Sequence, residues 1–211
     1  MSVKDYMSEL QAGNGGETPD GLRVERLLLA SASPRRAEIL RAVDWPFDAA
    51  PVNLREERGA GEGPVAYVER LAREKAEAAA ALHPERLVLG ADTTVVVKGE
   101  VLEKPLDEED ARRMLRCLSG RWHEVLTGVA LVRGAVDNRR IRVAHERTEV
   151  RFAEMSDAEI AWYVRTGEPM DKAGAYAVQG RAALFIEAVR GDYWNVVGLP
   201  IRLVYRLSSS M

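Results

Sequence analysis

The sequence is poor in cysteine and in clustered histidine. Its single cysteine, Cys117, excludes an internal disulfide and a zinc site built from several thiolates. The histidines, His83, His123 and His145, lack the i,i+4 spacing that a metalloprotease helix uses to hold zinc. A bound metal should therefore be a hard ion held by carboxylates, such as Mg²⁺.

Long apolar runs and an excess of positive charge are also missing. No apolar run approaches the ~18 residues of a membrane span, and the first residues lack the apolar core of a signal peptide. A net charge of −3 gives no general attraction to nucleic acid or to an anionic membrane. We therefore expect a cytoplasmic protein with neither partner, in which any anionic ligand binds through local basic groups.

What is present is enough apolar sequence for a packed core. With 211 residues, 46% of them hydrophobic, the chain can form one globular domain or two small lobes. Residues 1–22, which end in glycine and polar residues, are expected to form a flexible extension, and 208–211 a frayed C-terminus.

Apolar patterning and turn signals predict a mixture of helices and strands. Strands are expected at 26–31, 87–97, 100–105, 123–133 and 142–152, with two more between 172 and 200. Helices are expected at 34–43, 65–82, 107–118, 156–167 and 199–207, with Ile39, Leu40 and Val43 facing inward and Ser156 and Glu159 forming a capping box. Because strands and helices do not alternate strictly, a mixed-sheet α/β fold is favoured over a regular βαβ series.

The segment "LASASPRR" places two arginines in the first turn of a predicted helix. Ser33 can cap this helix and Pro34 suits its first position. Arg35 and Arg36 are poorly placed next to the positive end of the helix dipole, unless a bound phosphate lies there. The alternative is two solvated arginines that tolerate a small penalty. The small residues before them allow close backbone approach, which favours the phosphate interpretation.

Lys75 lies inside the apolar stripe of the predicted helix 65–82. At about 100° per residue, Leu71 and Ala79 fall on the same side of that helix as Lys75. Lysine is seldom buried without a partner, so its ammonium group either extends past the apolar rim to water or points into a cleft beside an anion or a carboxylate.

Asp92 interrupts a run of β-branched residues in "LGADTTVVV", where an acidic residue contradicts strand propensity. It is either a strand-end residue that turns into a loop or a buried carboxylate that needs a cation, a metal or several donors. Lys104, and the pair Asp171 and Lys172, follow other predicted strands and can approach the same cleft. Cations and carboxylates gathered near strand ends are typical of phosphoryl-transfer sites with a divalent metal.

With these segments identified, the chain resembles the Maf family of nucleoside triphosphate pyrophosphatases from about Leu27 to Pro200. The resemblance rests on separate blocks in the same order: "LASASPRR", "RLAREKA", "LGADT", "GEVLEKP", "LSGRWHEVLTG", "GEPMDKAGAYAVQG" and "GDYWNVVGLP". It implies a single Maf-like domain over 23–207, an elongated α/β fold with a mixed, twisted sheet, and two lobes around a central cleft. This fold is similar in outline to that of inosine triphosphate pyrophosphatases.

The resemblance also implies a reaction and a set of site residues. The family hydrolyses the bond between the α- and β-phosphates with Mg²⁺, or alternatively Mn²⁺ or Co²⁺. Its catalytic aspartate, which accepts a proton from water, corresponds to Asp92. Its phosphate-contacting residues correspond to Ser33, Arg35, Arg36, Lys75 and Lys104. A metal ligand beside Asp92 corresponds to Glu57, or to Glu56 if the spacing shifts by one. A homodimer is also implied.

The family divides by substrate, and this chain is similar to the branch that acts on dTTP and UTP. The matching residues are Arg35, Thr93 of "GADT" and Gln179 of "AVQG". A glutamine amide offers both a donor and an acceptor to a pyrimidine edge. Two other functions stay open at this point: a nucleotidyltransferase that uses a triphosphate, and a non-catalytic nucleotide-sensing regulator of cell division.

Overall fold

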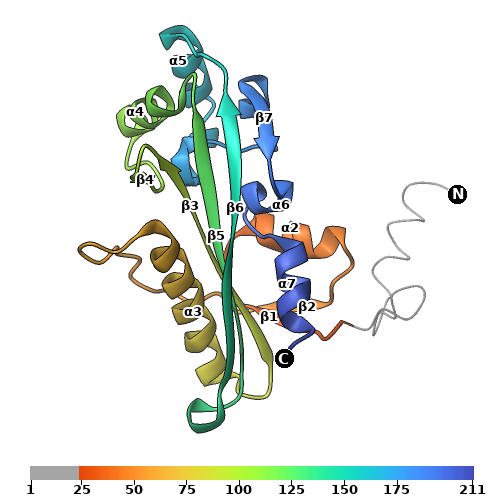
Figure 1. Ribbon diagram of the computed structural model, residues 1–211. Helices are drawn as coiled ribbons and strands as arrows, with labels where there is room; N and C mark the ends of the chain where they lie inside the picture. The colour runs from red at the N-terminus through yellow and green to blue at the C-terminus, as the bar shows by residue number, and fades with distance from the viewer. Residues whose placement is uncertain (1–23) are drawn as a thin grey trace, which may run out of the picture.

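A computed structural model describes residues 24–211, and the expected extension at 1–22 lies outside this range. The described chain is an elongated α/β structure (Figure 1). The strands are β1 (Leu27–Leu29), β2 (Phe47–Ala49), β3 (Leu87–Val97), β4 (Glu100–Leu102), β5 (Trp122–Arg133), β6 (Arg140–Phe152) and β7 (Ile186–Arg190). The α-helices are α2 (Pro34–Ala42), α3 (Pro64–Leu82), α4 (Glu108–Leu118), α5 (Asp157–Arg165), α6 (Tyr193–Val197) and α7 (Ile201–Ser208). The 3₁₀ helices are η1 (Val136–Asn138), η2 (Glu168–Asp171), η3 (Ala173–Ala175) and η4 (Arg181–Leu184).

These strands form one mixed sheet with the order β2-β1-β3-β5-β6-β7. β1 is parallel to both β2 and β3, whereas β5, β6 and β7 continue the sheet in antiparallel fashion. On one edge of β3, β1 pairs with Leu87 to Leu89 and β4 pairs with Val95 to Val97. Between these two pairings, among the described residues, no strand covers that edge, so the middle of β3 faces an opening in the sheet.

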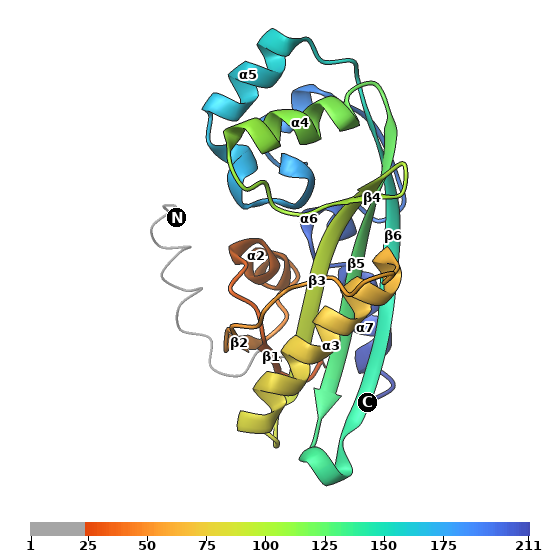
Figure 2. The ribbon, with the colours of Figure 1, turned by 90° about the vertical axis from the view of Figure 1, so that its left-hand side faces the viewer.

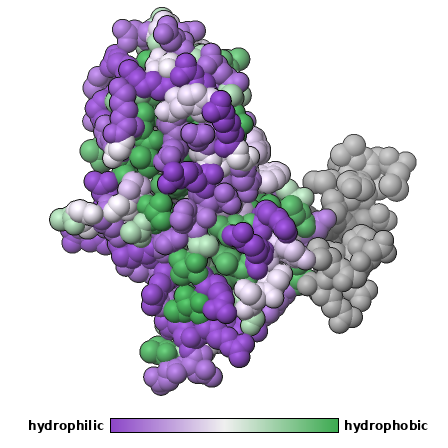
Figure 3. All heavy atoms as spheres, in the orientation of Figure 1, coloured by the Kyte–Doolittle hydropathy of each residue, from purple (hydrophilic) through white to green (hydrophobic). Residues whose placement is uncertain are grey.

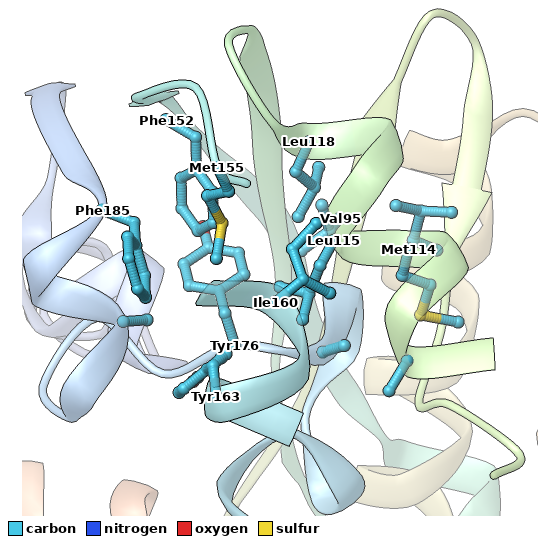
Figure 4. Close-up of a cluster of buried hydrophobic side chains, with 14 of the residues drawn as sticks. Val95, Met114, Leu115, Leu118, Phe152, Met155, Ile160, Tyr163, Tyr176 and Phe185 are labelled. Atoms are coloured by element: carbon cyan, nitrogen blue, oxygen red, sulfur yellow. The ribbon is translucent and has the colours of Figure 1, made fainter. Parts of the chain in front are cut away.

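Helices cover the two faces of the sheet unequally. α3 lies along one face, where its alanines pack on Val88 and Ala130 (Figure 2). On the other face, α2 and α7 pack against the half of the sheet that contains β1, and α4 and α5 pack against the half that contains β4. The second of these clusters joins Val95 of β3 to Leu115, Phe152 and Tyr163 (Figure 4). These two packing centres define the two lobes.

The predicted elements and the mixed α/β class agree with the structure over most of the chain. Three details differ. Val43, expected to face inward, ends α2 with 40% of its surface exposed. The stretch 172–200 contains one strand, β7, instead of two, and its remainder forms 3₁₀ turns and α6. β2 was not expected, and it is a three-residue strand created by pairing with β1.

The end of the chain continues in hydrogen-bonded turns. The backbone N–H groups of Ser210 and Met211 donate to carbonyl groups of Leu207 and Ser208, and Met211 packs against the core next to α7. Residues 208–211, expected to fray, are therefore tied to the last helix in this structure. Within residues 24–211, no helix combines the length and apolar character needed to cross a membrane.

The surface on the face shown in Figure 3 is largely polar. Apolar atoms occur there in several separate groups among polar ones. Large apolar side chains that are individually exposed belong to different elements, as Leu82 at the end of α3 and Leu106 before α4 illustrate. Single exposed apolar residues of this kind are ordinary on a protein surface.

Candidate active site

A cleft of about 440 Å³ opens at the uncovered edge of β3, between the two lobes. It is lined by residues that are far apart in the sequence. They include residues 30–36, Glu56, Lys75, residues 92–95, Glu103, Lys104, residues 171–173, residues 176–179 and residues 196–198. Every site residue predicted from the sequence, except Glu57, therefore lies at this one cavity.

The alternation of side chains along β3 divides the site into two parts. Gly90 and Asp92 lie on the side of the sheet covered by α3, because successive strand residues point to opposite faces. Thr93 points to the other face, where it meets α2 and the end of α6. Asp92 is therefore not at a strand end. It lies inside the strand at the point where the sheet has an opening.

Lys75 holds two carboxylates at this point. Its Nζ donates to Oδ1 of Asp92 at 2.7 Å and lies 2.6 Å from Oε1 of Glu56. Only 9% of the Lys75 side chain and 10% of the Asp92 side chain are exposed. The ammonium group therefore does not extend to water. Lys75 can lie within the apolar stripe of α3 because two carboxylates in the cleft pair with it.

Burial and neighbouring charges act in opposite directions on the two acids. Burial raises the pKa of Asp92, and the charges of Lys75 and Arg36 offset only part of that rise. Burial also raises the pKa of Glu56, but the hydrogen bond and charge of Lys75, with help from Lys104 and Arg36, lower it below its usual range. The balance of burial and charge thus makes Asp92 a stronger base, and Glu56 a weaker one, than the same side chain in water.

Two glycines allow α3 to approach closely enough for this contact. A Cβ atom on Gly90 would overlap the carbonyl oxygen of Ala72, and one on Gly128 would overlap that of Val68. Gly128 is the β5 partner of Asp92 in the sheet register. The backbone of α3 thus rests directly on the sheet beside Asp92, and Lys75 is brought within hydrogen-bond reach of it.

Arg36 is buried and firmly held by protein acceptors. Its Nε donates to the carbonyl of Gly198 at 2.9 Å, and its Nη1 and Nη2 donate to the hydroxyls of Ser31 and Thr93 at 2.9 and 3.2 Å. Burial lowers the pKa of Arg36, while the charges of Asp92 and Glu56 raise it. Three of its five N–H groups are thus engaged, and Arg36 is a fixed cation that ties α2 to β3 and to the end of α6.

Arg35, the neighbouring arginine, reaches across the cleft. Its Nη1 contacts Oδ2 of Asp171 at 3.2 Å, and Asp171 also pairs with Lys172. Burial raises the pKa of Asp171, but hydrogen bonds from Lys172 and Arg35 more than offset this and lower it. Arg35 therefore belongs to one lobe and its carboxylate partner to the other.

The structure contradicts the expected cap at Ser33 and places Glu57 outside the cleft. Ser33 occupies the N-cap position of α2, yet its side chain makes no capping hydrogen bond. The hydroxyl of Ser31 instead accepts from the backbone N–H of Ser33 and from Arg36. Glu57 does not face the cleft but pairs with Arg55 at the surface, and the carboxylate beside Lys75 belongs to Glu56.

The remaining predicted residues lie around the rim. Lys104 is exposed on the cleft wall after β4, and its charge contributes to the low pKa of Glu56. The preceding Glu103 accepts a hydrogen bond of 2.6 Å from Tyr67 of α3, which joins the two walls there. Gln179 also lines the cavity and is exposed.

Sequence reasoning missed a buried network of neutral polar groups behind Thr93. The Thr93 and Thr127 hydroxyls lie 3.0 Å apart, and Thr127 also donates to the carbonyl of Asn195. The Asn195 amide donates to the carbonyl of Val125 and to the hydroxyl of Thr148, both at 3.0 Å. An asparagine in the apolar block "NVVGLP" was the available signal, since a buried amide needs partners. The network fixes α6 against three strands.

The donor set at the cleft fits a hard divalent cation that is shared with a phosphate ligand. Among residues 24–211, no group of three or more metal-ligating side chains converges on one point. Glu56 and Asp92 nevertheless converge on the same ammonium group, which places two carboxylates in one small region. Mg²⁺ is commonly held by one or two carboxylates together with substrate phosphates and water.

Comparison with known proteins agrees with this geometry. Residues 26–211 match the family described as Maf-like protein. The chain is 56% identical over 178 residues to the dTTP/UTP pyrophosphatase of Symbiobacterium thermophilum. The aligned region covers 84% of this chain and 90% of that relative. It is 54% identical over 181 residues to the dTTP/UTP pyrophosphatase of Koribacter versatilis, with 86% and 92% covered.

The fold has a counterpart among solved structures. The Ham1 protein of Staphylococcus aureus superposes with a TM-score of 0.51 at 14% identity, covering 88% of this chain and 99% of that one. At this identity the likeness concerns the fold alone. The sequence match extends over nearly all of the described residues, and the chain belongs to the Maf family.

Proposed function

We propose that this member of the Maf family hydrolyses pyrimidine nucleoside triphosphates, dTTP and UTP and their base-modified analogues, to a nucleoside monophosphate and pyrophosphate. The observation that carries the proposal is the buried group of Asp92, Lys75 and Glu56 at the centre of a cleft lined with further cations. The curated relatives that are named dTTP/UTP pyrophosphatases support the choice of substrate.

Asp92 is assigned the role of general base. Lys75 holds Oδ1, and Oδ2 is the oxygen that we assign to the attacking water. A base is most effective when its pKa lies close to the working pH, and burial moves the pKa of Asp92 in that direction. The charges of Lys75 and Arg36 favour the ionised form of Asp92, which is the form that accepts the proton as water attacks.

The cations of the cleft are assigned to the triphosphate. Arg35 and Lys104 lie on opposite sides of the cavity, and Arg35 exchanges its contact with Asp171 for a phosphate when substrate enters. Arg36 contributes a fixed positive charge at the start of α2, where backbone N–H groups also favour an anion. Ser33, freed from a capping role, completes this phosphate-binding wall.

The metal is assigned to Glu56 and Asp92, because, of the two glutamates left open by the sequence, Glu56 and Glu57, it is Glu56 that lines the cleft. Mg²⁺ bound there supplies positive charge that stabilises the departing pyrophosphate. The chain itself contributes the two carboxylates and keeps them close together through Lys75. Base selection is assigned to Gln179 and Thr93 together with Arg35, all of which line the same cavity.

A panel of nucleoside triphosphates tests the proposed function. The protein is incubated with each triphosphate and Mg²⁺ without any acceptor, and monophosphate, pyrophosphate and free phosphate are measured separately. We expect monophosphate and pyrophosphate in equal amounts, fastest from dTTP and UTP, and no turnover with EDTA. Release of free phosphate would contradict the bond assignment, and turnover that requires an acceptor would identify a nucleotidyltransferase instead.

A further inference from the structure

The residue assigned to base reading, Gln179, lies in a short turn on the cleft wall. The backbone N–H of Gly180 donates to the carbonyl of Ala177 at 3.0 Å, so residues 177–180 form a β-turn with Gln179 as its third residue. No helix or strand includes this turn, which lies between η3 and η4. The position of the Gln179 amide therefore depends on how the two ends of the turn are held.

Both ends of the turn are held by one pair of side chains from outside the cleft. The Tyr163 hydroxyl of α5 donates to Oε1 of Glu168 at 2.7 Å. The same hydroxyl accepts from the backbone N–H of Ala177 at 3.2 Å. The other oxygen of Glu168 accepts from the backbone N–H of Arg181 at 3.1 Å. One tyrosine–glutamate pair thus fastens the residues on both sides of Gln179.

The pair is rigid for two reasons. Tyr163 is fully buried in the core of its lobe, and its ring packs edge-on with that of Phe185 (Figure 4). Burial raises the pKa of Tyr163, and the hydrogen bond to Glu168 raises it further, so the hydroxyl keeps its proton and remains a donor. The carboxylate of Glu168 lies directly against Cα of Gly180, where any Cβ atom would overlap it. A Cβ atom at residue 180 would therefore push the turn and the Glu168 carboxylate apart.

The same segment also anchors the acidic residue that faces Arg35. The ammonium group of Lys172 donates to the backbone carbonyl of Glu168 at 2.7 Å and pairs with Asp171. Glu168 thus contacts, through its backbone and its side chain, both parts of the wall that face the ligand. Neither Tyr163 nor Glu168 lines the cavity, so neither touches a bound nucleotide.

We propose that Tyr163 and Glu168 are positioning residues for base selection: together they fix the 177–180 turn so that the Gln179 amide meets a pyrimidine edge. This inference rests on the proposed function. It assigns to the second lobe the turn that positions the base-reading residue, whereas the cations assigned to the triphosphate come from both lobes, Arg35 and Arg36 from the first and Lys104 from the second. Loss of the pair should loosen selection among bases while leaving the reacting groups in place.

Two variants disturb the Tyr163–Glu168 pair, called the clamp below, in different ways. Tyr163→Phe removes the hydroxyl and keeps the ring, and Gly180→Ala pushes the turn away from Glu168 without removing any polar group. Tyr205→Phe in α7 and Gly63→Ala, where a Cβ atom meets open space, are the matched controls. For each protein, binding of α,β-methylene analogues of UTP and GTP is measured by calorimetry, and UTP hydrolysis is measured in parallel.

The preference for the UTP analogue over the GTP analogue should fall roughly tenfold in both clamp variants, since misplacement of about an ångström has effects of this size or larger. The controls should keep the wild-type preference within about twofold. Amide hydrogen exchange supplies a readout that does not depend on catalysis: Tyr163→Phe should speed exchange at Ala177, and Gly180→Ala at Arg181. Affinity for inorganic triphosphate should stay unchanged in all variants.

The outcomes separate this inference from the proposed function. If the wild-type protein binds the UTP analogue selectively but does not hydrolyse UTP, the proposed function is wrong and the clamp variants still test base selection. An unchanged preference in both clamp variants, an equal loss of affinity for both analogues and for triphosphate, or a wild-type protein without base preference would each overturn the inference. A poorly folded Tyr163→Phe protein leaves Gly180→Ala to decide.

Discussion

The two faces of β3 differ sharply at adjacent residues. On the face covered by α3, Asp92 meets a lysine and a second carboxylate, and every group in the contact carries charge. On the opposite face, Thr93 accepts from Arg36 and meets Thr127, which donates to the backbone carbonyl of Asn195, and apart from Arg36 the donors and acceptors of this network are neutral. One residue step along a strand thus separates a cluster of paired charges from a network in which the single cation has only neutral hydrogen-bond partners.

Burial disfavours charge on both faces, and the faces differ in what opposes it. The pKa of His123, on the neutral face, falls to about 4 because burial penalises its protonated form. The pKa of Asp92 rises for the same reason, but Lys75 and Arg36 counteract the rise. The buried ion pair of Lys75 and Asp92 thus lies where the sheet is open and opposite charges converge, and we assign the phosphate ligand to this place.

Removing the cation of the charged face should have the largest effect of the following three changes. Lys75→Met should lower kcat/KM for UTP by about 10²- to 10³-fold, the usual cost of one preorganised charge-stabilising donor. Since Lys75 lowers the pKa of Asp92, the acidic limb of the pH–rate profile should also move to higher pH.

Arg73→Met is the matched control for that change. Arg73 lies on the same helix, is more than half exposed and pairs with Glu77 at the surface. This variant should retain the wild-type rate and pH profile. If the acidic limb of the pH–rate profile does not move in Lys75→Met, Lys75 does not lower the pKa of Asp92. The proposed coupling of these two charges would then be wrong.

Lowering the pH should reduce the unfolding free energy through protonation of His123, which lies on the same face of the sheet as Thr93. An unfolded histidine has a pKa near 6.5, so the contribution of the neutral buried ring is complete above that pH and is lost as pH falls towards about 4. The loss amounts to about 3 kcal/mol of unfolding free energy. His123→Gln should show a flatter dependence than wild type in denaturant unfolding between about pH 7 and about pH 4.

His83→Gln, at the end of α3, serves as the control and should keep the wild-type slope. The two curves for wild type and His123→Gln would coincide in shape if the ring were protonated in the folded protein. That coincidence would show that the face of the sheet on which Thr93 lies accommodates a protonated His123.

The neutral network should contribute to stability more than to turnover. Asn195→Ala removes two hydrogen bonds: the Val125 carbonyl loses the amide donor, whereas the Thr148 hydroxyl keeps its two contacts with the backbone of Asp192. We expect a loss of about 2 kcal/mol in unfolding free energy, the usual cost of an unsatisfied buried group. Below the melting temperature kcat should change far less than in Lys75→Met. A large loss of rate with unchanged stability would reverse the roles of the two faces.

The sequence made the central residues visible because they conflict with their surroundings. Lys75 breaks an apolar helix face and Asp92 breaks a β-branched strand, and each needed a partner of opposite charge. The structure supplies each to the other. Long periodic elements such as α3 and β3 were predictable for the same reason, since their patterns extend over many residues.

Other features depend on contacts that no local pattern records. Whether Glu56 or Glu57 faces Lys75 depends on the path of a glycine-bearing loop that has no sequence periodicity. At the start of α2, the Ser33 side chain does not cap the helix, and the Ser31 hydroxyl accepts from the backbone N–H of Ser33 instead. The turns at 173–181 replace an expected strand because Gly174 and Ala175 adopt positive φ angles. The need for Gly128 arises only when α3 lies on the sheet.

The most direct test of the central claim is the turnover of UTP by Asp92→Asn, with binding of the α,β-methylene analogue measured on the same protein. Asparagine keeps the size of the side chain but cannot take a proton from water. We expect kcat to fall about 10³-fold or more, within the range attributed to a general base, in a folded protein that still binds the analogue. Turnover within about tenfold of wild type would contradict this expectation.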